Sequence, residues 1–490
     1  MTRLSAATLA DLPADVLRPG YDRVAVKTGV VHLGIGAFHR AHQAVVFDDA
    51  LAAGDRRWGI VAASLRSPAV RDHMVPQDCL YTLLVRDGAG EAARVIGAVQ
   101  DVIVAPEDPE ALLAVMAAPD THIVTLTVTE KGYKLDPATG ALIEGDAQLA
   151  ADIVSLDRPQ TAPGYIVAAL ARRRSAGLPP FTAISCDNLP HNGTRLRAAV
   201  LELARRHDPA LAEWIAARGA FPETMVDRIV PATTAEDIAA LAARMGIEDQ
   251  AMVKAEPFVQ WVIEDRFCGP RPVFGAGVQL TAAVAPWEEA KLRLLNGAHS
   301  AIAYLGGLAG IEHVHEVLAL PEARVLVEAL WDESQTTLSP PAELDIATYR
   351  RALMARFDNP TLRHRTRQIA MDGSQKLPQR LLAPIAARLE AGQSIEALAL
   401  AVAAWMRWQG GWDDQGQAFT VDDPLADTTA ACLAQAGDTA ARVDSLLGIE
   451  SIFPPALAGS GAFRMALVHW LGRIETDGAR GALRDFKRAE

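Results

Sequence analysis

Short apolar runs alternate with segments of helical spacing from about residue 25 to about residue 280 of the chain. Runs of this kind separated by helices are typical of a parallel sheet, because each crossover between parallel strands needs a covering helix. The pattern therefore predicts an α/β domain. The predicted strands are Val30–Leu33, Trp58–Leu65, Ile123–Val128 and Phe181–Ser185.

The character of the chain changes after Trp287, where strand signals become rare and helical spacing dominates. A chain of 490 residues also exceeds the size at which one core stops growing. We therefore expect an α/β domain over residues 1–283 and a mostly α-helical domain over residues 284–490. The predicted helical segments of the second domain are Glu288–Leu308, Pro321–Trp331, Ile346–Phe357, Arg380–Ala391, Ile395–Trp408 and Leu425–Leu447.

The charge balance restricts the possible partners. The 47 Lys and Arg residues against 60 Asp and Glu residues give a formal charge of -13. Nucleic acids and anionic membranes require a basic surface, so a small-molecule ligand is the expectation. No heptad repeat is present, which leaves a monomer as the default.

The cysteines and the apolar runs indicate a cytoplasmic protein. The four cysteines have neither CxxC nor zinc-type spacing, which argues against a disulfide framework or a cysteine metal site. The first 20 residues lack the apolar stretch of a secretory signal. The longest apolar run, Ala397–Met406, is too short to cross a bilayer.

A glycine turn follows the first predicted strand. In Gly34-Ile-Gly36-Ala37-Phe38-His39, two glycines precede a predicted helix, where a dinucleotide's pyrophosphate can approach the backbone. His39 stands where a third glycine or alanine would permit close helix–strand packing, so the fingerprint is incomplete. Gly34, Gly36, Ala37 and Phe38 are the candidate cofactor contacts, with a plain tight turn as the alternative.

The second predicted strand ends in Leu65-Arg66-Ser67, without the acidic residue that usually binds the ribose hydroxyls of NAD. Arg66 is a candidate partner for a 2′-phosphate, or else a solvated arginine. The residues alone leave NAD and NADP open.

The segment Lys291-Leu-Arg-Leu-Leu-Asn296-Gly-Ala-His299 places a potential base, an amide and an imidazole on one predicted helix. At about 100° per residue, all three side chains fall within about 140° of the helix circumference. They can therefore address one cleft. The alternative is a surface lysine beside an ordinary helix histidine.

Six motifs in order carry a family resemblance. They are Gly34–Gln43, Thr127–Tyr133, Ser185–Gly193, Met225–Pro231, Glu256–Asp265 and Lys291–His299. From about residue 20 onward the chain resembles the polyol-specific long-chain dehydrogenases, which include mannitol 2-dehydrogenase, arabinitol dehydrogenase and fructuronate reductase (D-mannonate oxidoreductase). The resemblance implies a Rossmann-type N-terminal domain, a helical C-terminal domain closing over the cleft, NAD as cofactor, and metal-independent oxidation of a secondary alcohol.

The resemblance also implies roles for individual residues. Lys291 is the general acid/base, Asn188 and Asn296 donate hydrogen bonds to the reacting oxygen, and His299 orients the substrate. Glu130 and Asp227 lie near the site and could bind substrate hydroxyls, with a structural cap or a surface ion pair as the alternative.

These residue types suit the chemistry. Without a metal to acidify the alcohol, a side-chain base must take the hydroxyl proton. A lysine begins near a pKa of about 10.4, so Lys291 must be buried or lie near positive charge to act closer to neutral pH. Two fixed amide donors stabilise the negative charge that develops on the oxygen.

The segment from Arg363 to Arg380 bears on the substrate. It contains Arg363, Arg365, Arg367, Lys376 and Arg380, and arginine and lysine are the natural partners of a carboxylate. The amino-acid sequence of this segment resembles that of the fructuronate reductase branch, whereas mannitol-type relatives usually carry arginine at the position of Gln368. Lys376 and Arg365 are the candidate carboxylate contacts.

Three alternatives stay open. The Ser185–Gly193 motif resembles the mannitol enzymes as closely as it resembles the fructuronate reductase branch, so a neutral polyol is one alternative substrate. An altronate-type uronate is a second alternative. An inactive NAD(H)-sensing protein is the third, although the acid/base lysine and both asparagines are present.

Overall fold

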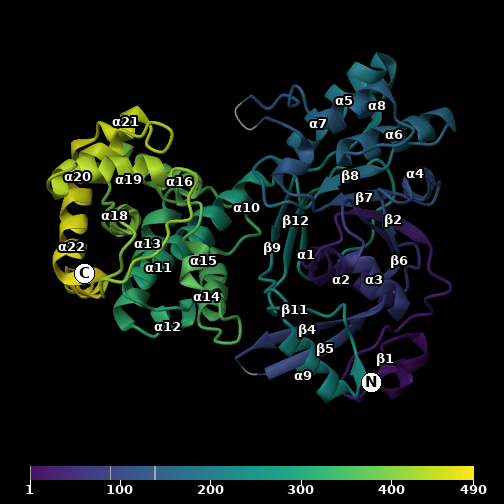
Figure 1. Ribbon diagram of the computed structural model, residues 1–490, viewed down its shortest axis with the longest axis horizontal. Coiled ribbons are helices and arrows are strands. Elements are labelled where there is room, and N and C mark those ends of the chain that lie inside the picture. The colour runs from purple at the N-terminus through teal and green to yellow at the C-terminus, as the bar shows by residue number, and fades with distance from the viewer. Residues whose placement is uncertain (1, 89, 137–138, 490) are drawn as a thin grey trace. The chain divides into compact units, whose positions relative to one another are not determined.

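The computed structural model describes residues 2–88, 90–136 and 139–489. It divides into two compact units, Met1–Val284 and Ala285–Glu490. Figure 1 shows that the first unit holds the strands and that the second is built of helices. The predicted fold class, an α/β domain followed by a mostly helical one, is therefore confirmed.

A five-stranded sheet forms the centre of the first unit, and all of its strands run parallel. The glycine turn follows its middle strand, so this turn opens at the carboxyl edge where α/β sheets bind ligands. In order across the sheet the strands are β6 (Val99–Val104), β3 (Gly59–Ser64), β2 (Thr28–Leu33), β7 (Ile123–Leu126) and β8 (Thr182–Ser185).

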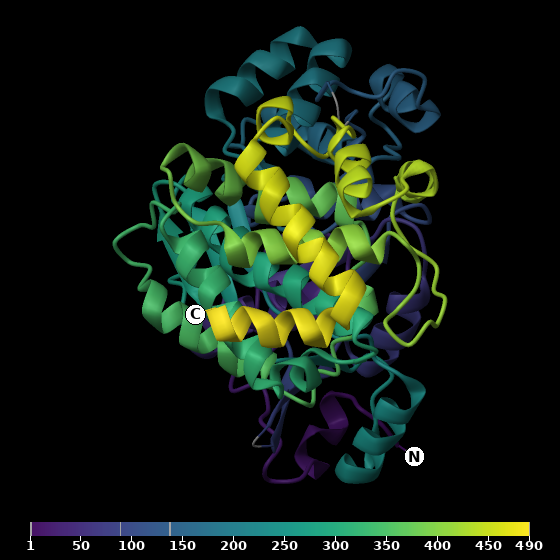
Figure 2. The same cartoon turned by 90° about the vertical axis from the view of Figure 1, so that its left-hand side faces the viewer.

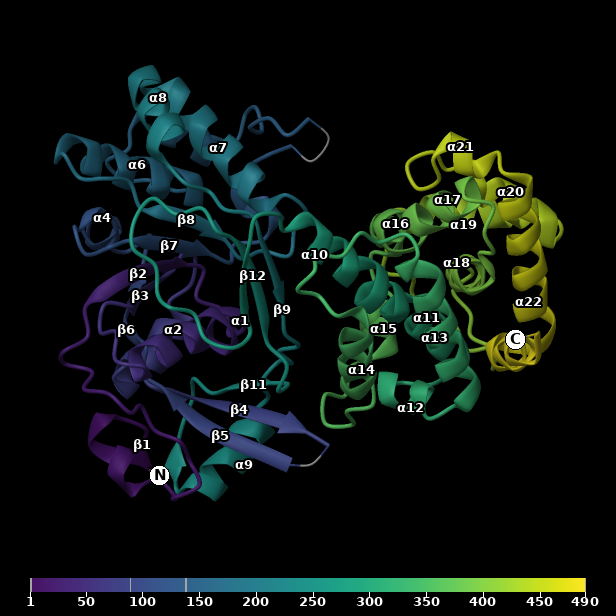
Figure 3. The ribbon, with the colours of Figure 1, turned by 180° about the vertical axis from the view of Figure 1, so that it is seen from behind.

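Both faces of this sheet are buried. Along β2, Val30 belongs to one hydrophobic cluster and its neighbour Val31 to another, because successive side chains of a strand point to opposite faces. Figure 3 shows helices on both sides of the sheet. One face is covered by α2 (Gln43–Ala52), and the other by α4 (Pro109–Ala117), α6 (Ala162–Ser175) and α7 (Asn192–His207).

Smaller elements complete the first unit. The short helices are α1 (Ala37–Ala41), α3 (Ala69–Met74), α5 (Ala147–Val154), α8 (Pro209–Arg218) and α9 (Ala235–Met245), with 3₁₀ turns η1 (Ala6–Asp11), η2 (Val75–Gln77) and η3 (Glu130–Tyr133). The remaining strands form three sheets: β1 (Thr2–Arg3) with β10 (Ile247–Glu248); β11 (Val253–Ala255), β4 (Tyr81–Asp87) and β5 (Gly90–Ile96); and β13 (Val278–Thr281), β12 (Gln260–Glu264) and β9 (Thr224–Asp227).

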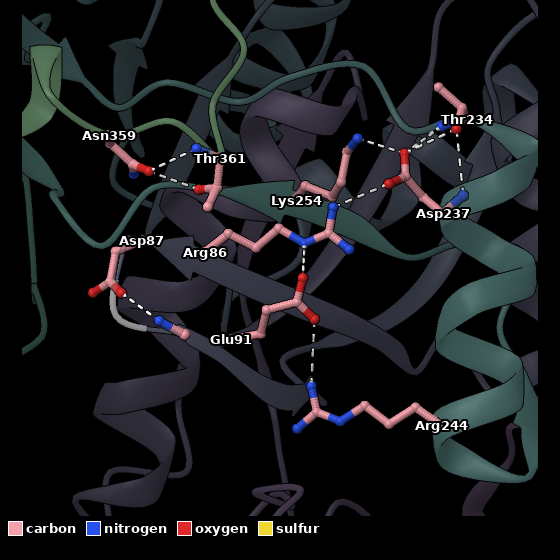
Figure 4. A network of polar contacts seen from close by, with 10 residues as sticks. Arg86, Asp87, Glu91, Thr234, Asp237, Arg244, Lys254, Asn359 and Thr361 are labelled. Atoms are coloured by element: carbon pink, nitrogen blue, oxygen red, sulfur yellow. Dashed lines mark hydrogen bonds and ion pairs between the residues drawn. The ribbon is translucent and has the colours of Figure 1, made fainter. Parts of the chain in front are cut away.

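An ion-pair network ties α9 to the sheet of β4, β5 and β11 (Figure 4). Arg86 of β4 contacts Glu91 of β5 at 2.5 Å and Asp237 of α9 at 3.1 Å. Lys254 of β11 also pairs with Asp237, and Arg244 lies 3.8 Å from Glu91. Because Asp237 is only 12% exposed, these charges are screened less than an ordinary surface pair.

The missing third glycine has a structural explanation. His39 of α1 is fully buried and stacks on His32 of β2, with ring centroids 3.4 Å apart and planes 9° from parallel. Two flat rings in van der Waals contact pack this helix on its strand without the small residue that the fingerprint normally places there. The incomplete motif is therefore compatible with a Rossmann turn.

Gly34 makes the closest backbone approach in the turn. Its φ is +100°, and a Cβ at this position would lie 2.2 Å from the carbonyl oxygen of Thr127. Only glycine fits, because both the backbone angle and the available space exclude a side chain. The end of β2 and the loop after β7 can therefore lie side by side.

All the described elements of the second unit are helices, and two of them form its centre. Every residue of α11 (Gly297–Leu308) is buried, as are nearly all of α18 (Glu396–Trp408). The others are α10 (Ala285–Ala290), η4 (Lys291–Asn296), α12 (Val314–Leu318), α13 (Pro321–Gln335), α14 (Ile346–Phe357), α15 (Thr366–Ile369), α16 (Gly373–Leu377), η5 (Pro378–Leu382), α17 (Ala383–Glu390), α19 (Ala426–Gln435), α20 (Thr439–Leu447), α21 (Pro455–Ala458) and α22 (Gly461–Ala489).

Several details differ from the helices predicted for this unit, which did not include the short helices α12, α15, α16 and α21. The segment Leu425–Leu447 is two helices, α19 and α20, rather than one. A long final element, α22, follows beyond the predicted segments; it turns at Gly478, where φ is +70°, and Figure 2 shows its two yellow parts meeting at an angle. Residues 291–296 form a π-helix, so the assumed 100° per residue does not hold across them.

We expect Gly34→Ala to destabilise the first unit by about 2–5 kcal/mol, because it combines left-handed strain with a backbone clash. Gly54→Ala is the matched control: its φ is +106°, but nothing lies within 4 Å of the added Cβ. The control should lose only about 1–2 kcal/mol. Chemical denaturation of both variants measures the difference, and equal losses would show that the close approach to Thr127 contributes nothing.

Candidate active site

The glycine turn leaves room for a cofactor at its second glycine. A Cβ on Gly36 would meet no described atom nearer than the Gly34 oxygen at 3.9 Å, so space lies open above this residue. Gly36 is also the N-cap of α1 and supplies no side-chain cap, while Ala37 and Phe38 begin the helix. Their backbone N–H groups can donate hydrogen bonds to a pyrophosphate. The residues of this turn therefore fit the pyrophosphate of a dinucleotide cofactor.

Arg66 lies beyond the carboxyl end of β3, two residues after Ser64, and its side chain is exposed. The turn that carries it is held by Ser64, whose hydroxyl donates to the carbonyl oxygen of Ser67 at 2.5 Å. No carboxylate stands at the tip of this strand, from Ser64 to Ser67.

A buried carboxylate joins the ends of β7 and β8. Asp187 is 8% exposed and accepts hydrogen bonds from the backbone of Val128 (3.2 Å) and Thr129 (2.9 Å) and from the Tyr133 hydroxyl (2.7 Å). Burial raises the pKa of Asp187, while the bond from Tyr133 opposes that shift. Asp187 thereby fixes the loop in which the next residue, Asn188, is exposed.

The two candidate carboxylates of this unit differ in environment. Glu130 is exposed, and its carboxylate lies 3.5 Å from the Arg195 guanidinium, which fits the alternative of a surface ion pair. Asp227 ends β9, is 6% exposed and pairs in register with Gln260 of β12. A buried acid at a strand end is the better candidate for binding a ligand.

The second unit presents the candidate proton-transfer residues on a π-helical turn. Lys291 opens η4 and is 6% exposed, and Asn296 closes it. The Asn296 side-chain oxygen is buried without a hydrogen-bond partner among the described residues. π-Helical turns inside α-helices are frequently found at functional sites.

His299 lies one turn further along, in α11, and is 6% exposed. Its ring packs 4.8 Å from that of Phe357 and 5.3 Å from that of His364. Burial, together with the charges of Arg356 and Arg380, holds the pKa of His299 well below its usual range. The imidazole is therefore neutral at physiological pH and able to hydrogen-bond a neutral hydroxyl.

A second π-helical turn, η5, packs against η4. From it Arg380 reaches the carbonyl oxygen of Asn296 (3.4 Å) and the Ser300 hydroxyl (3.2 Å). Lys376, in α16 just before it, donates to the carbonyl oxygens of Ile369 (3.4 Å) and Met371. Burial lowers the pKa of Arg380 to about 10, and it lowers the pKa of Lys376 with help from Arg380.

The basic residues of this segment thus fall into two groups. Arg363, Arg365 and Arg367 are exposed. Arg365 pairs with the exposed Glu312 at 3.2 Å, and Arg367 lies over the Phe419 ring. Lys376 and Arg380 are largely buried, and in the described part of the chain no carboxylate comes nearer than the 3.9 Å between Lys376 and Asp372.

Several site residues were missed by the sequence analysis. Asp187 and Tyr133 brace the loop of Asn188, and His364 and Arg356 flank His299. The first two stand inside quoted motifs, Asp187 one residue before Asn188, and that adjacency was the available signal. The other two carry no local pattern, because only tertiary packing brings them to α11.

No group of three or more His, Cys, Asp or Glu side chains among the described residues has the geometry to hold a metal ion. None of the helices in the described ranges is both long and apolar enough to cross a membrane.

Comparison with family models identifies the two units. Residues 28–275 match the mannitol dehydrogenase Rossmann domain, and residues 283–474 match the mannitol dehydrogenase C-terminal domain. The chain belongs to the mannitol dehydrogenase family. The resemblance noted from the six motifs is confirmed, and the chain is an oxidoreductase that acts on secondary alcohols. A Rossmann domain with this glycine turn binds NAD, so the expected cofactor is confirmed as well.

Relatives within the mannitol dehydrogenase family cover nearly the whole chain. D-mannonate oxidoreductase of Escherichia coli (strain K12) is 43% identical over 96% of this chain and 98% of its own. Mannitol 2-dehydrogenase of Phaeosphaeria nodorum is 41% identical over 99% of this chain and 85% of its own. The structure of Pseudomonas fluorescens mannitol 2-dehydrogenase with NAD and D-mannitol superimposes with a TM-score of 0.85 at 36% identity, covering both chains completely.

Four histidines with lowered pKa values, of which His32, His39 and His299 are buried and His364 is partly buried, should make the protein sensitive to acid. Burial lowers the pKa of His32 to about 3 and that of His364 to about 4, and it holds the pKa values of His39 and His299 well below the usual range. Below pH about 6.5 the unfolded chain binds protons that the folded chain does not. Each histidine then removes up to about 1.4 kcal/mol of stability per pH unit, until the pH reaches its folded pKa.

We therefore expect thermal stability to fall steadily from pH 7 to pH 5, with a smaller slope in His364→Gln. His73→Gln is the control, because His73 is exposed. Differential scanning fluorimetry across this pH range measures the slopes. An unchanged slope in His364→Gln would contradict the assignment of a neutral, partly buried imidazole at this position.

Proposed function

We propose that this protein is a cytoplasmic, NAD-dependent oxidoreductase that interconverts D-mannonate and D-fructuronate. The observation that carries the proposal is the pair of largely buried cations, Lys376 and Arg380, packed against the turn that bears Lys291 and Asn296. The similarity to D-mannonate oxidoreductase supports it, and four free cysteines agree with a reducing compartment.

The charge of this pair favours an acidic substrate. Removing a cation from water is costly unless a counter-charge replaces the lost hydration. Arg380 makes only neutral contacts with the described residues, and its charge lowers the pKa of Lys376. A substrate carboxylate would supply the missing negative charge, whereas mannitol and fructose carry none.

Arg380 is therefore a better candidate for the carboxylate than Arg365, which the sequence analysis had selected with Lys376. Arg365 is 67% exposed and already pairs with Glu312. A guanidinium can bind a carboxylate through two parallel hydrogen bonds, and the contact of Arg380 with the backbone carbonyl oxygen of Asn296 at 3.4 Å supports this choice.

Lys291 is proposed as the general acid/base. In the oxidation direction it accepts the hydroxyl proton as the carbon loses its hydride, and in the reduction direction it returns a proton to the carbonyl oxygen. NAD, when bound, supplies the hydride acceptor. Burial of Lys291 keeps water from competing for the proton.

The remaining roles are orienting ones. Asn296 and Asn188 are proposed to donate amide hydrogen bonds to the reacting oxygen, where negative charge develops. The unpaired side-chain oxygen of Asn296 shows that intrachain contacts do not fully occupy this amide. Neutral His299 is proposed to orient a substrate hydroxyl. Asp227 and Glu130 are further candidates for hydroxyl binding, with Asp227 preferred for its burial.

A neutral polyol is the second candidate substrate. It is favoured by the similarity to mannitol 2-dehydrogenases, both in sequence and in a solved structure. The same acid/base and amide residues would act on a neutral polyol. The two candidate substrates therefore differ only in whether Lys376 and Arg380 bind a carboxylate.

We expect D-fructuronate to be reduced by NADH with a kcat/KM about 10- to 100-fold above that of D-fructose, since a paired carboxylate contributes about 1.5–3 kcal/mol. Absorbance at 340 nm follows both reactions side by side. The reverse ranking would identify a mannitol 2-dehydrogenase and remove the role proposed for the two cations.

We expect Arg380→Gln and Lys376→Gln to raise the KM for D-fructuronate about 10- to 100-fold, because each removes a charged contact to the carboxylate. The rates with D-fructose should change much less. Arg365→Ala is the control and should leave both KM values near those of the wild type. Equal effects on the two substrates would show that the cations do not bind a carboxylate.

We expect Lys291→Ala to lower kcat about 100- to 10,000-fold, the usual contribution of a general acid/base, with the Kd for NADH nearly unchanged. Arg293→Ala is the control on the same turn, since Arg293 donates to the Thr337 carbonyl oxygen at 2.6 Å instead. Turnover assays and titration of NADH fluorescence separate the two effects. Full activity in Lys291→Ala would refute the assignment of the base.

A further inference from the structure

A cavity of about 390 Å³ lies in the first unit at the carboxyl ends of β3 and β6. Its wall includes Leu65, which follows β3, and Ala105, which follows β6. Since β3 is the neighbour of β2, this cavity opens one strand away from the glycine turn. A dinucleotide bound with its pyrophosphate at that turn extends its adenosine across the second strand, toward this cavity.

The lining suits a purine base. Leu65, Pro106 and Pro109 give apolar surface of the kind on which a flat ring packs. Gln148 and Gln160 add amide groups that can hydrogen-bond the edge of a base. The volume lies within the range of about 300–1,000 Å³ that is typical of small-molecule sites.

The charge of the lining is the unexpected feature. No Asp or Glu side chain is among the described residues that line the cavity, and Arg158 supplies a positive charge. A site that prefers NAD normally holds an acidic residue at the end of the second strand, which binds the ribose hydroxyls and repels a 2′-phosphate. Here Ser64, Leu65, Arg66 and Ser67 occupy that position.

Two neighbouring arginines differ in how far they are already paired. Arg71 forms ion pairs with Asp72, at 2.8 Å, and with Glu107. Arg66, which directly follows the cavity residue Leu65, is exposed and forms no ion pair with any residue the structure describes. It is therefore available to an incoming anion.

We propose that this cavity accepts an adenosine that carries a 2′-phosphate, with Arg66 and Arg158 as the side chains that bind it. The protein then uses NADPH in addition to NADH. The proposal concerns the adenosine end of the cofactor and does not depend on which sugar acid or polyol the enzyme oxidises.

Isothermal titration of the full-length protein with ADP-ribose and with 2′-phospho-ADP-ribose tests the proposal without turnover. We expect the two Kd values for the wild type to lie within about tenfold of each other. Arg66→Ala should weaken 2′-phospho-ADP-ribose about 10- to 100-fold, the loss of one charge-assisted contact, and change ADP-ribose less than about threefold. Arg158→Ala should act in the same direction.

Arg71→Ala is the matched control, because its charge is already neutralised by Asp72 and Glu107. It should not discriminate between the two ligands. The proposal is overturned if wild-type protein binds 2′-phospho-ADP-ribose more than about 100-fold more weakly than ADP-ribose, or if Arg66→Ala weakens both ligands equally. A protein that binds 2′-phospho-ADP-ribose but does not reduce fructuronate would retain this inference and lose the proposed substrate.

Discussion

The close approach of the β2 turn to the loop after β7 is the constraint on which the nucleotide-binding unit depends. Gly34 permits it by having no side chain where the Thr127 carbonyl oxygen lies. His39 then packs α1 onto β2 through its stack on His32, and Asp187 ties the ends of β7 and β8 together. Three neighbouring strand ends are thus held in one arrangement, and both the glycine turn and the loop of Asn188 take their positions from it.

In the second unit the corresponding constraint is the contact between two π-helical turns. Gly297 lies against the backbone of Arg380, where an added Cβ would stand 3.2 Å from its carbonyl oxygen. Close packing of η4 and η5 brings the proton-transfer residues and the two cations into one neighbourhood. On the proposed assignment, the helical frame supplies both the group that moves a proton and the group that recognises a charge.

The sequence was sufficient for the fold class and the family, and its motifs supplied the candidate site residues. Alternating runs predicted the parallel sheet, and the motif spacing placed Lys291, Asn296 and His299 in one continuous helical stretch, although the π-turn altered their angular relation. The sequence could not separate Arg365 from Arg380, because burial depends on which helix covers each residue. Nor could it reveal that His39 replaces a glycine by stacking, since His32 and His39 form no local motif and meet only in the folded unit.

Under the proposed function, the two partly buried cations would also determine what the site excludes. A neutral ligand that displaced the water around Lys376 and Arg380 would leave Arg380 with only neutral partners and Lys376 with two carbonyl oxygens and Asp372 at 3.9 Å. The lost hydration costs free energy even where every hydroxyl of the ligand is well bound. Under the proposed function, the site would select an acid in two ways, by attracting the carboxylate and by penalising its absence. Discrimination between sugar acids and sugar alcohols can therefore exceed the strength of the ion pair alone.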